Sequence, residues 1–172
     1  MHRLAHNNRL IRLSRNPLEA TVIANIVVPV DGSEHALRAL DHASYLAKLA
    51  DAKIHLLHIT PPDPQQLLET TGYSNTARRE AEASAASLKQ AQEEDARDII
   101  ATARDKLPTD VAIKERVIPG EPADTIVDYV SDLKDPLIVM GSRGLSAPRD
   151  WLLGGVSRTV LDLAECPVTL VH

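Results

Sequence analysis

Aromatic residues are nearly absent from this chain of 172 residues. They make up 2% of the sequence and phenylalanine does not occur, whereas hydrophobic residues reach 44%. The core must therefore be built from alanine, valine, isoleucine and leucine, which suits strands that are covered by helices on both faces. The same scarcity argues against the base-stacking platforms of proteins that bind single-stranded nucleic acids.

Cysteine is scarce too. Cys166 is the single one, which excludes an intrachain disulfide and a cysteine-rich zinc site. This composition fits a reducing compartment, and we expect a cytoplasmic protein. The net charge of −5 disfavours non-specific binding to nucleic acids or anionic membranes. No apolar run approaches the ~18 residues of a membrane span, and no secretory signal opens the chain. From the charge and from these absences we expect neither a nucleic acid nor a membrane as a partner.

Residues 1–24 differ from the rest of the sequence. They contain four arginines and one acidic residue, Glu19, with a weakly amphipathic pattern of leucine and isoleucine. We interpret them as a basic N-terminal extension that is frayed or loosely docked. A partner-docking arm and an arginine-rich organelle presequence are the alternatives.

From Asn25 onward, apolar runs alternate with helix-forming stretches. The runs at 26–30, 53–60, 111–118, 137–141 and 168–171 predict strands, and helices are predicted over 34–52, 76–106, 122–133 and 156–164. This alternation is typical of an α/β fold with a doubly wound, five-stranded, mostly parallel sheet. We expect a single domain over 25–172, in which residues 65–107 form a helical insertion after three closely spaced prolines.

Glycines gather beyond the fourth predicted strand. Gly141 and Gly144 follow that strand, and Gly154 and Gly155 stand where the next helix begins. Ligands of open α/β sheets bind beyond the carboxyl ends of the strands, and backbone N–H groups at a helix N-terminus attract anions. The pattern predicts a phosphate cradle, to which Ser157 can add a hydroxyl donor. Glycines that only close turns are the alternative, since the common nucleotide fingerprints and the nucleophile elbow do not occur.

These segments resemble the universal stress protein family from Asn25 to His172. The likeness rests on NIVVPVDGSEHALRALDHA, IHLLHIT, VIPGEPADTIVDY and IVMGSRG…LLGGVSRTVLDLAECPVTLVH. Nucleotide-binding members carry G-x-x-G, nine residues, and then G followed by Ser or Thr. This chain has Gly141 and Gly144 and, after nine residues, Gly154 and Gly155, so it resembles that nucleotide-binding subgroup.

The resemblance implies a Rossmann-like sheet of the adenine nucleotide alpha hydrolase type, with strand order 3-2-1-4-5. It implies a homodimer formed through residues 168–171. It also implies that ATP lies across the ends of the first and fourth strands, with Mg²⁺ held through its phosphates and not by protein ligands.

Twelve residues are implied at this nucleotide site. Those expected at the base and ribose are Pro29, Val30 and Asp31, with Ile59 bordering the adenine. Those expected along the ribose and phosphates are Met140, Gly141, Arg143 and Gly144, and those expected to hold the phosphates are Gly154, Gly155, Val156 and Ser157.

One position departs from the family pattern. Gly155 stands where the motif has Ser or Thr, so a hydroxyl is lost while the backbone N–H remains. A hydrogen bond to a charged group is worth roughly 1.5–3 kcal/mol, so we expect ATP affinity to fall on the order of tenfold or more. The Ser157 hydroxyl is the candidate that compensates for this loss.

Several neighbouring residues have simpler interpretations. Asp31 could serve only to cap the helix that follows it. Arg149 is expected to be solvated, and Trp151 to pack under the glycine loop or at a dimer surface. We expect a buried, inert thiol at Cys166 and a structural role for His58, because no partnering ligands stand at metal-binding spacing.

Three classes of function follow from these residues. The first is an ATP-binding stress-response module whose nucleotide state sets its conformation or its choice of partner, and the G-x-x-G element favours it. The second is a dimeric interaction scaffold of the same family that binds no nucleotide. The third is an enzyme, for which we assign no catalytic residue and expect at most slow ATP hydrolysis. As a hypothesis, residues 70–76 become ordered when ATP binds.

Overall fold

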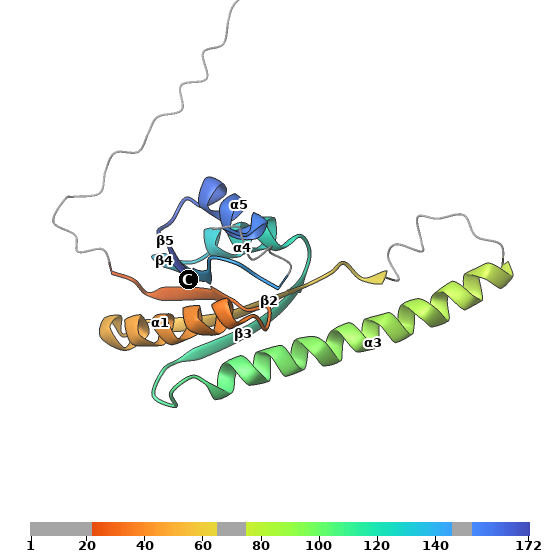
Figure 1. Cartoon of the computed structure of the whole chain (residues 1–172), viewed down its shortest axis with the longest axis horizontal. Helices are drawn as coiled ribbons and strands as arrows, with labels where there is room; N and C mark the ends of the chain where they lie inside the picture. Colours follow the sequence, from red (N-terminus) through yellow and green to blue (C-terminus); the bar gives the residue numbers. More distant parts are fainter. Residues whose placement is uncertain (1–21, 65–74, 146–152) are drawn as a thin grey trace, which may run out of the picture.

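The computed structural model describes residues 22–64, 75–145 and 153–172, and within them strands and helices alternate (Figure 1). The strands are β1 (Asn25–Pro29), β2 (Lys53–Thr60), β3 (Ile113–Pro119), β4 (Pro136–Gly141) and β5 (Val168–Val171). The helices are α1 (Glu34–Ala50), α3 (Asn75–Asp105), α4 (Pro122–Ser131) and α5 (Gly155–Leu163).

The strands form one sheet in the order β3-β2-β1-β4-β5. Every neighbouring pair is parallel, so the predicted fold class and the strand order implied by the family resemblance are both confirmed. Helices α1 and α3 pack against one face of the sheet, and α4 and α5 cover the other (Figure 1). The predicted strands and helices exist at the expected places, with ends that coincide or differ by one or two residues.

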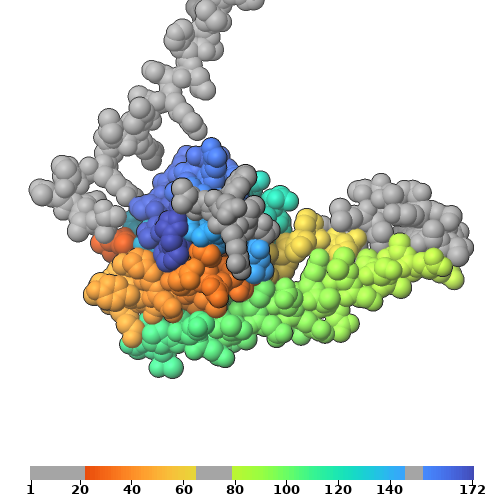
Figure 2. All heavy atoms as spheres, in the orientation of Figure 1, coloured from red at the N-terminus to blue at the C-terminus, as the bar shows by residue number. Residues whose placement is uncertain are grey.

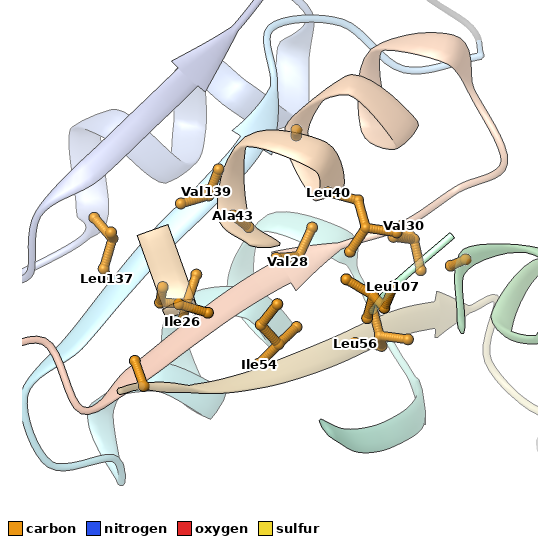
Figure 3. Packing of buried hydrophobic residues seen from close by; sticks show 14 of the residues in the cluster. Ile26, Val28, Val30, Leu40, Ala43, Ile54, Leu56, Leu107, Leu137 and Val139 are labelled. Carbon is orange, nitrogen blue, oxygen red and sulfur yellow. The ribbon is translucent and has the colours of Figure 1, made fainter. Parts of the chain in front are cut away.

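The central strand β1 is buried on both faces because its residues alternate between two hydrophobic cores. Ile26 and Val28 pack with α1 and α3, as Figure 3 shows for the first of these cores, whereas Val27 packs with α4 and α5. All three side chains are fully buried. Full burial of an aliphatic side chain contributes roughly 1.5–3 kcal/mol, so this uninterrupted apolar run fixes β1 at the centre of the sheet.

Helix α3 is longer than the sheet that it covers. Its 31 residues extend about 46 Å at 1.5 Å per residue, whereas the 8 residues of β2 extend about 26 Å. Ala96, Ile100 and Ala103, spaced by four and three residues, are buried near its C-terminal end. The C-terminal part of the predicted 65–107 insertion is therefore a crossover helix of the core, and the N-terminal part of α3 projects beyond the sheet (Figures 1 and 2).

One polar network lies inside the sheet, at His55. The ring is 2% exposed, and its Nε2 lies 2.9 Å from Oδ1 of Asn25. The Asn25 amide nitrogen donates to the carbonyl of Lys134, which fixes Oδ1 as the acceptor facing His55. Nε2 therefore carries the ring proton, and Nδ1 accepts from the hydroxyl of Tyr129 at 2.7 Å. A neutral imidazole thus joins β2 to β1 and α4.

This network makes stability depend on pH. Burial, followed by the charges of Lys114, Lys53 and Arg116, lowers the pKa of His55 from 6.5 to about 4. Below pH 6.5 the His55 side chain is protonated in the unfolded chain but remains neutral in the folded chain. Stability that is present above pH 6.5 is therefore lost as the pH falls toward 4. We expect this residue alone to make the free energy of unfolding about 2 kcal/mol lower at pH 5 than at neutral pH.

Urea unfolding of the parent chain and of His55→Gln at neutral pH and at about pH 5 measures this effect. The variant cannot titrate at this position, so its free energy of unfolding is expected to fall less between the two pH values. At neutral pH the variant is expected to be less stable than the parent chain. An equal loss in both chains would assign the acid sensitivity to other groups.

Candidate functional site

A cavity of about 600 Å³ opens at the carboxyl ends of β1 and β4. All the residues implied by the family resemblance line it, and they are Pro29, Val30, Asp31, Ile59, Met140, Gly141, Arg143, Gly144, Gly154, Gly155, Val156 and Ser157. The sequence analysis missed further lining residues, which are Ala36, Pro61, Pro122, Ile126 and Leu145. Ala36 and Ile126 are indistinguishable from core positions in the sequence, because only the meeting of their helices with the strand ends brings them to the cavity wall.

One part of the cavity wall is apolar. Ile59 comes from β2, Ile126 from α4 and Met140 from β4, and the latter two are almost completely buried. His58 is buried beside the cavity, and its Nδ1 donates to the carbonyl of the lining residue Val30 at 2.8 Å. The structural role expected for His58 is therefore confirmed. Such a surface suits a flat, uncharged ring system.

Another part of the wall is formed by the N-terminus of α5. The first bond of the helical ladder runs from the N–H of Arg158 to the carbonyl of Gly154, at 3.1 Å. The N–H groups of Gly155, Val156 and Ser157 therefore have no acceptor within the helix, and all three residues line the cavity. Together with the partial positive charge of the helix N-terminus and with Arg143, this arrangement suits an anion.

Two of the expected donors are engaged within the protein. The N–H of Gly154 donates to the carbonyl of Ser142 at 2.8 Å. The hydroxyl of Ser157 is 2% exposed and is shared between the carbonyls of Gly141 and Ser142, each at 3.0 Å. The expectation that this hydroxyl compensates for the one missing at Gly155 is therefore wrong, since its only proton holds α5 against the end of β4.

The glycines differ in what they make possible. A Cβ on Gly141 would lie 2.8 Å from the His35 carbonyl carbon, so this glycine lets β4 approach the first turn of α1. A Cβ on Gly144 would lie 2.5 Å from Oδ2 of Asp31. A Cβ on Gly155 would meet nothing within 4 Å. Gly141 therefore serves the close packing of β4 on α1, whereas at Gly155 the absent side chain leaves open space at the start of α5.

Asp31 connects two loops of the site. Its Oδ1 accepts the N–H of Ser33 at 3.0 Å, and its Oδ2 accepts the N–H of Leu145 at 3.1 Å. The helix cap of α1 is Ser33, whose hydroxyl accepts the N–H of Ala36 at 3.2 Å. The alternative that Asp31 only caps the helix is therefore wrong. Its carboxylate instead ties the turn after β1 to the segment that follows β4, at the wall of the cavity.

Some expectations fall on residues that the structure does not describe. Arg149 and Trp151 lie outside the described residues, and so do residues 70–74 of the segment expected to order with ATP. Cys166 is half-buried, and burial raises the pKa of its thiol, which agrees with the inert thiol that was expected. Within the described ranges, no group of three or more His, Cys, Asp or Glu residues could hold a metal ion. None of the helices described above combines the length and the apolar character needed to cross a bilayer.

Comparison with known proteins identifies the family to which this sequence is similar. Residues 23–172 match the universal stress protein family. The chain is 30% identical over 168 residues to Universal stress protein MJ0531 of Methanocaldococcus jannaschii, covering 95% of this chain and 88% of that protein. It is 33% identical over 147 residues to a universal stress protein of Thermus aquaticus, covering 86% and 97% of the two chains.

A solved structure agrees with these sequence matches. A universal stress protein in complex with cAMP is 26% identical to this chain, with a TM-score of 0.57, and the match covers 88% of this chain and 98% of that one. The family match covers nearly all of the described residues, including both strand ends and the helix N-terminus that form the cavity. The chain belongs to the universal stress protein family.

Proposed function

We propose that this chain binds an adenine nucleotide in the cavity between β1, β4 and α5, with ATP as the principal candidate. The observation that carries this proposal is one cavity that combines an apolar wall with a helix N-terminus whose first three N–H groups have no acceptor within the helix. A base joined to a phosphate group matches that combination. Support also comes from the solved relative that is described as a complex with cAMP, which is likewise an adenine ring joined to a phosphate.

In this proposal the apolar residues Ile59, Ile126 and Met140 border the base, and Asp31 accepts from a ribose hydroxyl. The N–H groups of Gly155, Val156 and Ser157 hold phosphate oxygens, with Arg143 beside them. Mg²⁺ enters with the ATP phosphates and neutralises part of their charge, because the described residues offer no cluster of ligands for it. We assign no catalytic residue and propose at most slow hydrolysis, since positioned phosphates and a metal support limited turnover.

We further propose that the bound nucleotide regulates the conformation or the partner choice of a stress-response module. Asp31 provides a route for this coupling. Its Oδ2 already holds the N–H of Leu145, so a ligand hydroxyl bonded to the same carboxylate weakens or redirects that contact. Ligand occupancy is thereby transmitted to the chain at Leu145, which is 73% exposed at the rim of the cavity.

The second candidate function is a dimeric interaction scaffold that binds no nucleotide. One observation favours it: the Gly154 N–H and the Ser157 hydroxyl are both consumed by backbone carbonyls. With Gly155 in place of Ser or Thr, the helix N-terminus offers backbone donors but no side-chain hydroxyl from the first turn.

For either function we propose a homodimer formed through β5. The Pro167 carbonyl accepts from Ile138 of β4 and the Val171 carbonyl from Ser142, the residue after β4. Residues of a parallel strand alternate between its two edges. Val168 and Leu170 therefore direct their N–H and C=O groups to the outer edge of β5. Among the described residues this edge pairs with no other strand, so it is available to a second copy of the chain.

Gly155 offers a direct test of nucleotide binding because open space surrounds it. Gly155→Ser restores a hydroxyl and is expected to tighten ATP binding about tenfold. Gly155→Asp places a carboxylate beside the phosphates and is expected to weaken binding at least about tenfold, while it stabilises the N-terminus of α5. Calorimetric titration of ATP with Mg²⁺, compared with AMP and GTP, measures these affinities on protein stripped of nucleotide.

The two variants form a matched pair, since both add a small side chain at one position and neither should lower the melting temperature. Gly144→Val is a poorer choice because its side chain would displace the Asp31 carboxylate. No heat and no competition at millimolar ATP, in the parent chain and in Gly155→Ser alike, would exclude nucleotide binding and leave the scaffold function.

The dimer is tested by Leu170→Pro. Proline removes the outward N–H of Leu170, whereas the Val171 carbonyl contact to β4 involves the other edge of the strand. Because this hydrogen-bond donor is lost from the outer edge of β5, we expect the dissociation constant of the dimer to rise at least about tenfold. The melting temperature is expected to change only modestly. Sedimentation over a range of concentrations measures the constant, and an unchanged value would place the interface elsewhere.

A further inference from the structure

A second cavity, of about 380 Å³, lies at the opposite end of the sheet, where β4 and β5 begin. Its wall comes from the residues just before β1, the last turns of α4 and α5, and the segments that lead into β4 and β5. We call it the amino-end groove. It shares no lining residue with the cavity at the carboxyl ends of the strands, so the two cavities form separate sites.

The amino-end groove exposes aliphatic side chains. Val22 is 60% exposed and Leu163 is 48% exposed, although both line a concave surface. Val130, which is almost completely buried, belongs to the same wall. Aliphatic side chains that remain exposed within a hollow mark a surface that gains free energy when another chain segment covers it.

The surroundings of the groove are acidic. Asp135 and Glu165 line it, and the adjoining segments 128–135 and 162–167 together contain five acidic residues and one lysine. Helices α4 and α5 both end here, so the partial negative charges of their C-termini add to the same potential. An occupant that is both aliphatic and basic therefore fits this groove best.

Residues 1–21 of the same chain have this chemistry. They carry four arginines against one glutamate, in a protein whose net charge is −5, and their aliphatic residues are Leu4, Leu10, Ile11, Leu13 and Leu18. The chain passes from this segment directly into Val22, which already lines the groove. Leu13 stands nine residues before Val22, so at about 3.3 Å per residue the chain between them reaches about 30 Å, and such tethering gives millimolar effective concentrations.

We propose that residues 9–18, RLIRLSRNPL, dock in the amino-end groove of their own chain. Their aliphatic side chains cover Val22 and Leu163, and their arginines lie against the acidic residues around the groove. The basic N-terminal segment thereby covers the amino-end groove, at the end of the sheet opposite to the main cavity.

Cys166 provides a built-in reporter of this contact. It lines the amino-end groove, and it is the single cysteine of the chain. A neutral thiol reagent such as 4,4′-dithiodipyridine therefore reacts only at the groove, at a rate that falls when the groove is covered. Since the reagent carries no charge, changes in the charge of the protein do not alter its local concentration.

The experiment compares the full-length parent chain with the full-length triple variant Leu10→Ser, Ile11→Ser and Leu13→Ser. The matched control is His6→Ser, Asn7→Ser and Asn8→Ser, which changes three neighbouring residues without removing an aliphatic side chain. A segment docked about four fifths of the time slows the reaction about fivefold, so we expect the triple variant to react about fivefold faster and the control to match the parent.

A second measurement reports the charge complementarity. Arg12→Glu with Arg15→Glu is expected to accelerate the reaction of Cys166 at low ionic strength. High salt should accelerate the parent but not the triple variant, because salt screens the arginines from the acidic groove. Urea midpoints that match the parent confirm that each variant remains folded.

Equal reaction rates in the parent, in the triple variant at positions 10, 11 and 13 and in the control variant would overturn the proposal. Protection of Cys166 that disappears when the protein is diluted would also overturn it, since the segment would then come from a second copy. Neither result depends on ATP, so failure here is distinct from failure of the proposed nucleotide site.

Discussion

The contacts between the start of α5 and the end of β4 fix the geometry of the main cavity. The Gly154 N–H donates to the carbonyl of Ser142, and the Ser157 hydroxyl donates to the carbonyls of Gly141, the last residue of β4, and Ser142. These bonds hold the helix so that Gly155, Val156 and Ser157, whose N–H groups have no acceptor within the helix, line the cavity. The Ser157 hydroxyl therefore acts through position: it holds the helix in place, and Ser157 offers the cavity only its backbone N–H.

The cavity itself exists because two chain segments leave the sheet in opposite directions. After β1 the chain turns into α1, which packs on the face shared with α3, and α5 packs on the face shared with α4. Since β1 and β4 are neighbours, their ends diverge and leave a crevice at the point where the strand order reverses. Asp31 bridges this crevice through Ser33 and Leu145, so the two diverging loops remain coupled.

Parallel topology also gives the two ends of the sheet opposite electrostatic character. At the carboxyl ends of the strands, a helix N-terminus and Arg143 favour a negative ligand. At the amino ends, the C-termini of α4 and α5 and the acidic residues around the amino-end groove favour a positive one. One protein with a negative net charge thus presents a surface for anions at one end and a surface for cations at the other.

The amino-acid sequence by itself determined the alternation of strands and helices, because buried parallel strands require continuous aliphatic runs such as that of β1. Together with the family resemblance it also located twelve of the residues that line the main cavity, since strand ends and helix starts are local signals. The tertiary structure alone decided what the individual groups do. It assigned the helix cap to Ser33 and not to Asp31, committed the Ser157 hydroxyl to two carbonyls, and placed Gly141 against His35. These outcomes depend on atoms brought together from distant parts of the chain, and hydrogen-bond partners and close contacts of that kind leave no pattern in the sequence.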